Sequence, residues 1–122
     1  MSDRYRLLTS VDELESVVAS SSTRPVLIFK HSLTCGTSAW AHEEVEAVLD
    51  TPSLPVDVYV VHVQTSRAVS SAIAERFGVR HESPQALLVQ HGHVVWHASH
   101  HRLSMAATAA AMQQCVSEPT II

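Results

Sequence analysis

Residues 26–29 read Val-Leu-Ile-Phe, an apolar run in which apolar and polar side chains do not alternate. A strand with one face in water alternates, so an unbroken run is typical of a strand that is covered on both faces. Helices cover both faces of a sheet when right-handed crossovers join its parallel strands. Residues 26–29 therefore predict a central strand in an α/β fold.

Strand-like and helix-like segments alternate along the rest of the chain. β-branched and apolar stretches predict strands at residues 5–8, 26–29, 56–63, 86–89 and 94–96. Apolar residues at helical spacing predict helices at residues 11–19, 40–49, 66–77 and 104–115. The order β-α-β-α-β-α-β-β-α is that of the thioredoxin fold, with a mixed sheet of four to five strands flanked by helices on both faces. We expect residues 1–122 to form a single thioredoxin-like domain.

Local motifs support these boundaries. Ser10 and Glu13 have the spacing of a capping box, in which each side chain satisfies a backbone donor at the start of a helix. Gly78 suits the left-handed position that ends a helix. Residues 90–93, Gln-His-Gly-His, separate two short apolar runs and predict a hairpin.

Charge and composition exclude several classes of partner. The chain has 8 basic and 12 acidic residues, so it offers no basic surface for a nucleic-acid backbone. Its N-terminal residues lack the pattern of a signal peptide, and no apolar run is long enough to span a membrane. We expect a cytoplasmic protein without a nucleic-acid or membrane partner. The sequence leaves the oligomeric state open.

Cys35 lies in the stretch HSLTCGTSAWA, between the predicted central strand and the following helix. Loops at the carboxyl ends of parallel strands are favoured places for a site. The free N–H groups and the dipole at a helix N-terminus stabilise a thiolate, which is the nucleophilic form of cysteine. Cys35 is therefore the candidate nucleophile.

The neighbours of Cys35 complete the expected site. Gly36 places no side chain beside the sulfur, so a bulky disulfide can approach it, and Thr37 and Ser38 continue the same polar rim. We expect these three residues to contact substrate. Lys30 and His31 add positive potential if their side chains face the thiol, and the sequence does not fix that orientation.

The second cysteine, Cys115, is expected to pack near the end of the last helix. Eleven residues separate Ser104 from Cys115, which places that thiol roughly 16 Å along a helix that runs away from the site. A disulfide needs Cα atoms within about 7 Å. Ser38 stands three residues after Cys35, where a dithiol oxidoreductase has its second cysteine, so we predict a mechanism with one thiol.

The dipeptide Ser83-Pro84 precedes the predicted strand at residues 86–89. Thioredoxin-like folds carry a cis proline at this place, facing the active-site cysteine. Only about 5 to 6% of X-Pro bonds in folded proteins are cis, so this expectation comes from the fold. A cis Pro84 leaves the Ser83 backbone free to pair with an extended substrate segment beside Cys35.

The segments FKHSLTCGTSAWA and ERFGVRHESPQALLVQHGHVVWHASHH resemble the monothiol bacilliredoxin family, thioredoxin-like proteins of the bacillithiol redox system. The resemblance covers most of the chain. It implies an enzyme in which Cys35 attacks a mixed disulfide between bacillithiol and a protein cysteine and takes bacillithiol onto itself. A second bacillithiol then regenerates the thiol, so the resemblance implies no bound cofactor, bacillithiol as co-substrate and bacillithiolated proteins as partners in redox homeostasis.

Two other functions remain open. The tetrapeptide CGTS is similar to the CGFS of monothiol glutaredoxins, some of which hold an iron-sulfur cluster between two subunits with glutathione. Those proteins grip glutathione with a Gly-Gly pair and an acidic residue, whereas this chain has Ala98-Ser99-His100-His101 there. The second alternative is a redox sensor in which Cys35 is capped under oxidative stress without turnover.

Histidines gather late in the chain. We place His97, Ser99, His100 and His101 in a loop on the same rim as Cys35, where His100 is expected to grip the anionic part of bacillithiol. Metal binding is an alternative for the imidazoles of His81, His91, His93, His97, His100 and His101. Their spacing matches no zinc template, so we predict no metal site.

Overall fold

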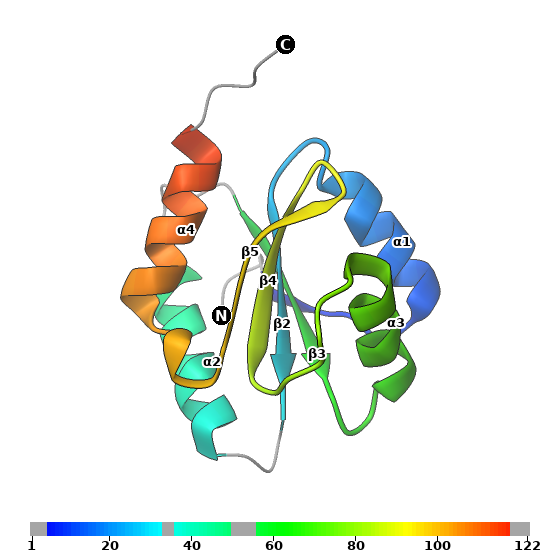
Figure 1. The fold of residues 1–122 in the computed structure, drawn as a ribbon, viewed down its shortest axis with the longest axis horizontal. Coiled ribbons are helices and arrows are strands. Elements are labelled where there is room, and N and C mark those ends of the chain that lie inside the picture. Colours follow the sequence, from blue (N-terminus) through cyan, green and yellow to red (C-terminus); the bar gives the residue numbers. More distant parts are fainter. Residues whose placement is uncertain (1–4, 33–35, 50–55, 118–122) are drawn as a thin grey trace.

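The structure is a computed structural model that describes residues 5–32, 36–49 and 56–117, with the backbone alone at residues 5, 36–39, 46, 48, 49, 101, 105 and 115–117. In these ranges the strands are β1 (Tyr5–Leu7), β2 (Val26–His31), β3 (Asp57–His62), β4 (Gln85–Gln90) and β5 (His93–Ser99). The helices are α1 (Val11–Ser20), α2 (Gly36–Leu49), α3 (Arg67–Phe77) and α4 (Met105–Ser117), with a short 3-10 helix, η1 (His100–Arg102), before α4. Figure 1 shows these elements in place.

The strands form one mixed sheet in the order β1-β3-β2-β4-β5. β2 occupies the middle of the sheet and pairs in parallel with β3, which pairs in parallel with β1. β4 and β5 add an antiparallel half on the other side of β2. The predicted central strand and the predicted fold class are confirmed.

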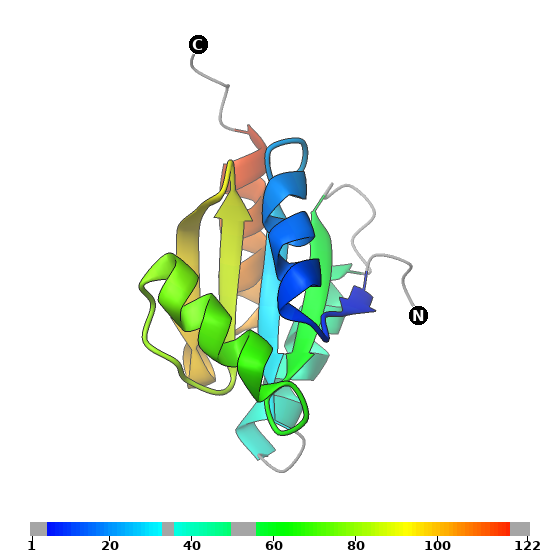
Figure 2. The ribbon, with the colours of Figure 1, turned by 90° about the vertical axis from the view of Figure 1, so that its right-hand side faces the viewer.

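Helices cover both faces of this sheet (Figures 1 and 2). α2 and α4 pack on one face, against a cluster of buried side chains that includes Leu27 and Phe29 of β2. α1 and α3 pack on the other face, where Val26 and Ile28 of the same strand are buried. Each β2 side chain therefore points into one of two cores, which is why the run shows no apolar–polar alternation.

The helix boundaries follow the local signals, with one difference in detail. The Ser10 hydroxyl accepts a hydrogen bond from the Glu13 N–H at 3.1 Å, as a capping residue should. The Glu13 carboxylate instead accepts from the hydroxyls of Thr9 and Ser10, so the reciprocal half of the capping box is not formed. At the end of α3, Gly78 has φ of 65° and takes the expected left-handed position.

The hairpin is confirmed, but its second strand is longer than predicted. His91 and Gly92 form the turn with φ of 53° and 77°, the left-handed values that a two-residue hairpin turn needs. β5 then runs to Ser99, which pairs with Gln85 of β4. The prediction that His97 and Ser99 lie in a loop is therefore wrong. β5 is an edge strand, where polar side chains are tolerated. Its polar residues therefore did not indicate that the strand continues to Ser99.

No helix in the described ranges is both long enough and apolar enough to cross a lipid bilayer.

Candidate functional site

Helix α2 begins at Gly36, immediately after Cys35 in the sequence. Cys35 itself lies outside the described residues, and so do the side chains of Gly36, Thr37, Ser38 and Cys115. The first backbone N–H groups of a helix lack intrahelical partners and favour negative charge nearby. The start of α2 at Gly36 agrees with the predicted setting of the thiol, and the roles of these residues stay predictions.

The Ser83-Pro84 peptide bond is cis, as expected from the fold. It precedes β4, and the Pro84 carbonyl accepts a hydrogen bond of 2.9 Å from the backbone N–H of His100. The segment before β4 is thereby joined to the start of η1. Three residues predicted for the site, Ser83, Pro84 and His100, are brought together at one end of the sheet.

Lys30 and His31 lie next to each other at the end of β2, but their side chains point to opposite faces of the sheet. His31 faces α2, where its ring centroid is 4.9 Å from that of His42 and 5.8 Å from that of His62. Lys30 faces α3, where its Nζ is 3.1 Å from Nδ1 of His81. The two expected sources of positive potential thus belong to different surroundings.

Lys30 is the only lysine of the chain, and its exposed fraction is 0%. Among the described residues no carboxylate lies within ion-pair distance of it. Burial lowers the pKa of Lys30 to about 8, because the charged form loses its hydration. Nδ1 of His81 also lies 3.1 Å from the Ser70 hydroxyl oxygen, so His81 is a polar contact of the buried ammonium.

The contact with Lys30 decides the protonation of His81. An ammonium group only donates, so Nδ1 of His81 must be unprotonated to accept from it, and the ring proton then lies on Nε2. Burial and the nearby charge of Lys30 lower the pKa of His81, in agreement with a neutral ring. His81 therefore presents an Nε2–H donor on the side away from Ser70.

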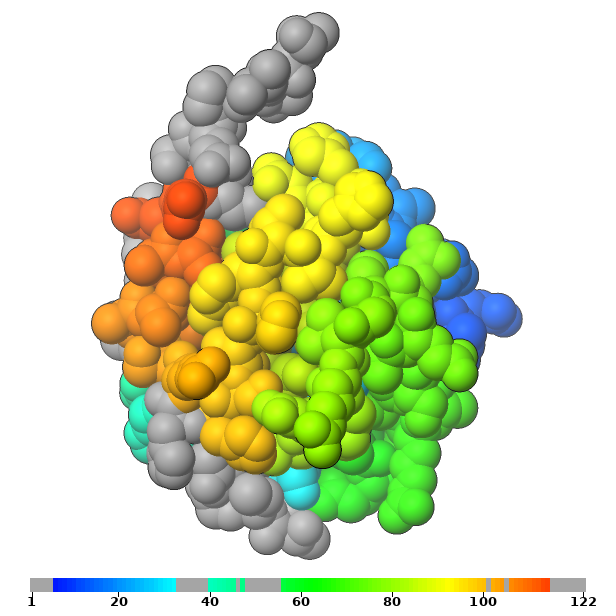
Figure 3. Space-filling view, viewed as in Figure 1, coloured from blue at the N-terminus to red at the C-terminus, as the bar shows by residue number. Residues whose placement is uncertain are grey.

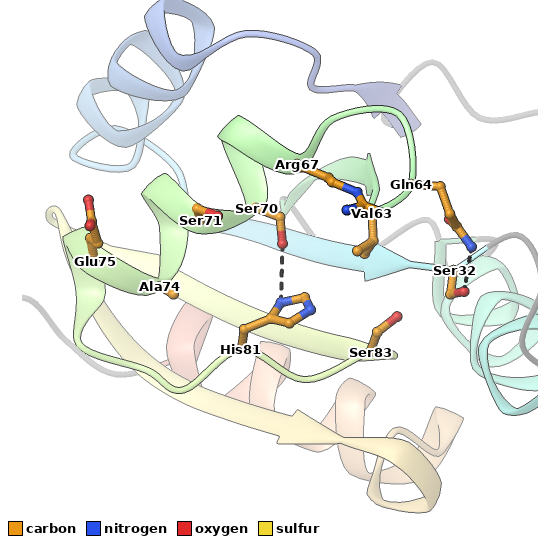
Figure 4. Close-up of a pocket in the computed structure, with 10 residues that line it drawn as sticks. All are labelled: Ser32, Val63, Gln64, Arg67, Ser70, Ser71, Ala74, Glu75, His81 and Ser83. Carbon is orange, nitrogen blue, oxygen red and sulfur yellow. Dashed lines mark hydrogen bonds between the residues drawn. The ribbon is translucent and has the colours of Figure 1, made fainter.

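A groove of about 480 Å³ opens between helix α3 and the segment before β4 (Figure 4). We call it the α3 groove. It is lined by Ser32, Val63, Gln64, Arg67, Ser70, Ser71, Ala74, Glu75, His81 and Ser83. Ser32 and Ser83 lie at the end near the start of α2, and Glu75 lies at the far end (Figure 4).

A second groove of about 510 Å³ lies on the other side of the Ser83-Pro84 segment, and we call it the η1 groove. It is lined by Glu82, His97, Ala98, Ser99, His100 and Arg102. In Figure 3 the end of β5 lies against the segment before β4 on this face of the molecule. Nε2 of His100 is 3.7 Å from a Glu82 carboxylate oxygen. His100, which was predicted as a substrate contact, therefore has an acidic side chain beside it in this groove.

The Glu82 carboxylate has several polar and charged neighbours. A hydrogen bond from the Ser99 side chain lowers the pKa of Glu82 most, and the nearby charges of His100, Arg80 and Arg102 lower it further, against a smaller effect of burial. This carboxylate is therefore ionised at neutral pH.

Apart from Ser83, sequence reasoning did not assign the residues of the α3 groove to a substrate site, above all Arg67, Ser70 and His81. The signal was present in β2: strand alternation places Lys30 on the same face as Val26 and Ile28, under α3. A lone lysine on that face needs a polar partner. The partner's identity depends on tertiary packing and was not readable.

The expectation of no metal site concerns the clustered histidines. Among the described residues, no three side chains of His, Cys, Asp or Glu are grouped so that they could hold one metal ion. His91 lies in the hairpin turn and His93 begins β5, while His97 and His100 line the η1 groove.

Known proteins resemble this chain over most of its length. The family described as monothiol bacilliredoxin BrxC matches residues 6–107. A solved structure described as a candidate oxidoreductase with a thioredoxin fold is 34% identical, covers 88% of this chain and 92% of its own, and superposes with a TM-score of 0.79.

Thioredoxins also share the architecture. A thioredoxin from Malassezia sympodialis is 22% identical over 90% of this chain and 89% of its own, with a TM-score of 0.71. A thioredoxin variant from Halobacterium salinarum is 20% identical over 98% of this chain and 97% of its own, with a TM-score of 0.75. At these identities the likeness shows the fold alone.

Proposed function

Because the chain belongs to the monothiol bacilliredoxin family, we propose that it removes bacillithiol from mixed disulfides on proteins through Cys35. Family and fold together indicate a redox enzyme that works by thiol chemistry. The observation that carries the finer proposal is the family match, which spans the cysteine loop, the Ser83-Pro84 segment and β5.

The proposed reaction exchanges disulfides and needs no other oxidant or reductant. The Cys35 thiolate attacks the bacillithiol sulfur of the mixed disulfide, a bond forms between these two sulfurs, and the protein cysteine leaves as a thiolate. The thiolate of a second bacillithiol then attacks the bacillithiol sulfur bound to Cys35. This step releases the Cys35 thiolate and yields bacillithiol disulfide.

The surroundings of the loop support such a reaction. Helix α2 begins directly after Cys35 in sequence and offers its free N–H groups to a thiolate. Ser38 follows in the first turn of α2, at the place of a second cysteine, and a serine cannot close a disulfide. We propose Gly36, Thr37, Ser38, Ser83, Pro84 and His100 as substrate contacts, and bacillithiol as co-substrate without a bound cofactor.

The test offers two modified forms of one target protein, capped with bacillithiol or with glutathione, to the wild type and to Cys35→Ser. We expect the wild type to release bacillithiol faster than glutathione and the variant to release neither. Equal release of both thiols would contradict the bacillithiol preference and leave a general thiol oxidoreductase. Capping of Cys35 without turnover would instead indicate a redox sensor.

The iron-sulfur alternative has its own measurement. Two Cys35 thiolates from two subunits would have to hold the cluster, as in some monothiol glutaredoxins. We expect anaerobic iron-sulfur reconstitution to leave the protein colourless. A stable brown dimer whose colour is lost in Cys35→Ser would contradict the proposed function.

A further inference from the structure

The α3 groove has the size and the lining of a small-molecule site. Its volume of about 480 Å³ falls within the range of roughly 300 to 1,000 Å³ that is usual for such sites. Seven of its ten lining residues carry a hydroxyl, amide, guanidinium or imidazole group, and the apolar ones are Val63 and Ala74. These groups offer hydrogen bonds to a polar ligand from walls whose exposed surface is otherwise largely apolar.

Arg67 gives the groove a cation that is available to a ligand. Within the part of the chain that the structure describes, no carboxylate pairs with the Arg67 guanidinium. Arg24 and Arg76 differ in this respect, since they pair with Asp57 at 3.3 Å and with Glu15 at 2.9 Å. A guanidinium with no internal partner is suited to a carboxylate on a ligand.

The buried ammonium of Lys30 lies behind the same groove. Nδ1 of His81 accepts from Lys30, so the ring offers Nε2–H, and in Figure 4 this nitrogen faces the end of the groove where Ser83 lies. A positive charge in a poorly hydrated interior also acts over a longer range than one in water. Both effects favour an acceptor or an anion in the groove.

Ser83 contributes a hydrogen-bonding group that is not satisfied within the described chain. Its Oγ is buried and has no hydrogen-bond partner there, and in Figure 4 the hydroxyl points toward the groove. Leaving a buried hydroxyl without a partner is unfavourable. A ligand that reaches this end of the groove can supply the partner.

We propose that the α3 groove binds the carboxylate-bearing, hydroxylated part of the low-molecular-weight thiol, with Arg67 and His81 on the carboxylate and Ser83 near the reacting end. This inference rests on the proposed function and adds where the co-substrate lies. The η1 groove is the rival place. In the η1 groove the ionised Glu82 repels the carboxylate of a ligand, and it already lies beside His100 as a possible ion-pair partner.

Binding is tested without turnover. Reduced bacillithiol is titrated into ¹⁵N-labelled Cys35→Ser protein, and the amide shifts are mapped along the chain. We expect the largest shifts at residues 64–71 and 81–83. Shifts confined to residues 97–102, or no shifts at millimolar bacillithiol, would overturn the proposal.

Kinetics provide the second readout, with a matched control on the same helix. Arg67→Gln should raise the KM for bacillithiol about fivefold to tenfold by removing a charge-assisted hydrogen bond, with kcat changed less than about twofold. Arg76→Gln, which lies outside the groove, should match the wild type. Equal KM values for the two variants would overturn the proposal.

The two measurements separate the groove from the function. If the wild type turns over and the two variants have equal KM values, the proposed function is supported and binding of the thiol in the α3 groove is excluded. If there is no turnover but the amide shifts appear at residues 64–71 and 81–83, the proposed enzymatic function is contradicted and the groove remains a thiol-binding site.

Discussion

The α3 groove and the η1 groove flank the same Ser83-Pro84 segment and have similar volumes, about 480 and 510 Å³. Both contain basic side chains. They differ in the acid: Glu82 lines the η1 groove next to His100, whereas the carboxylate of the α3 groove, Glu75, lies at its far end.

The difference shows that a count of basic residues does not locate an anion site. The histidine-rich segment after β5 attracts attention in the sequence, but Glu82 and Ser99 already interact there. The α3 groove has fewer basic residues along its wall and a buried ammonium behind it. What matters for a ligand is whether the charges have partners within the protein.

The largest predicted effect concerns Lys30, whose ammonium contacts His81 of the α3 groove. Its pKa is about 8 in the folded protein and 10.5 ordinarily, so the unfolded chain binds more protons between these values and stability rises with pH there. The rise amounts to at most about 3 kcal/mol in the free energy of unfolding. This pH-dependent rise in the free energy of unfolding should be absent from Lys30→Met, as measured by urea unfolding at several pH values. Parallel pH profiles for wild type and variant would contradict this assignment.

Charge reversal compares the grooves directly. Arg67→Glu should raise the KM for bacillithiol by about tenfold or more, because it places a carboxylate against the thiol's own acid. Arg102→Glu makes the same change in the η1 groove and should alter the KM less than about twofold. The comparison fails if Arg102→Glu has the larger effect in steady-state assays.

Ser83→Ala tests whether the Ser83 hydroxyl contacts the bound thiol near its reacting end. The hydroxyl has no partner within the described chain, so its removal should leave the free energy of unfolding unchanged or slightly higher. The KM for bacillithiol should rise about threefold to fivefold if a ligand satisfies it. A variant that is destabilised and keeps its KM would show a structural hydroxyl instead. Thermal unfolding and steady-state kinetics measure the two quantities.

The smallest effect is expected from Glu82→Gln in the η1 groove. The pKa of Glu82 is lowered, chiefly by Ser99, so its stabilising contribution is present above the ordinary value of 4.5 and is lost as the pH falls through the lower folded value. The variant should melt slightly earlier near neutral pH and together with the wild type in acid. A difference that persists unchanged in acid would contradict this explanation.

The sequence predicted the fold well where one signal dominated. The unbroken apolar run of β2 follows from burial on both faces, and the cap at Ser10 and the left-handed Gly78 follow from local backbone chemistry. The length of β5 was missed because an edge strand accepts polar residues, so His97 and Ser99 resembled a loop.

The site was predictable only in part. The chemistry of Cys35 stays a prediction that rests on its place before a helix and on family resemblance, whereas the cis Pro84 expected from the fold is confirmed. The contact between Lys30 and His81 joins residues 51 positions apart. Strand alternation places Lys30 on the same face as Val26 and Ile28, but only packing shows that α3 covers this face and selects the partner of Lys30.

The most direct test of the single-thiol mechanism is intact mass spectrometry after one equivalent of bacillithiol-capped target is mixed with the protein. We predict one bacillithiol adduct per chain, located on Cys35, in amounts equal to the released target thiol. The adduct should be absent from Cys35→Ser. An adduct on Cys115, or a disulfide between Cys35 and Cys115, would contradict the mechanism.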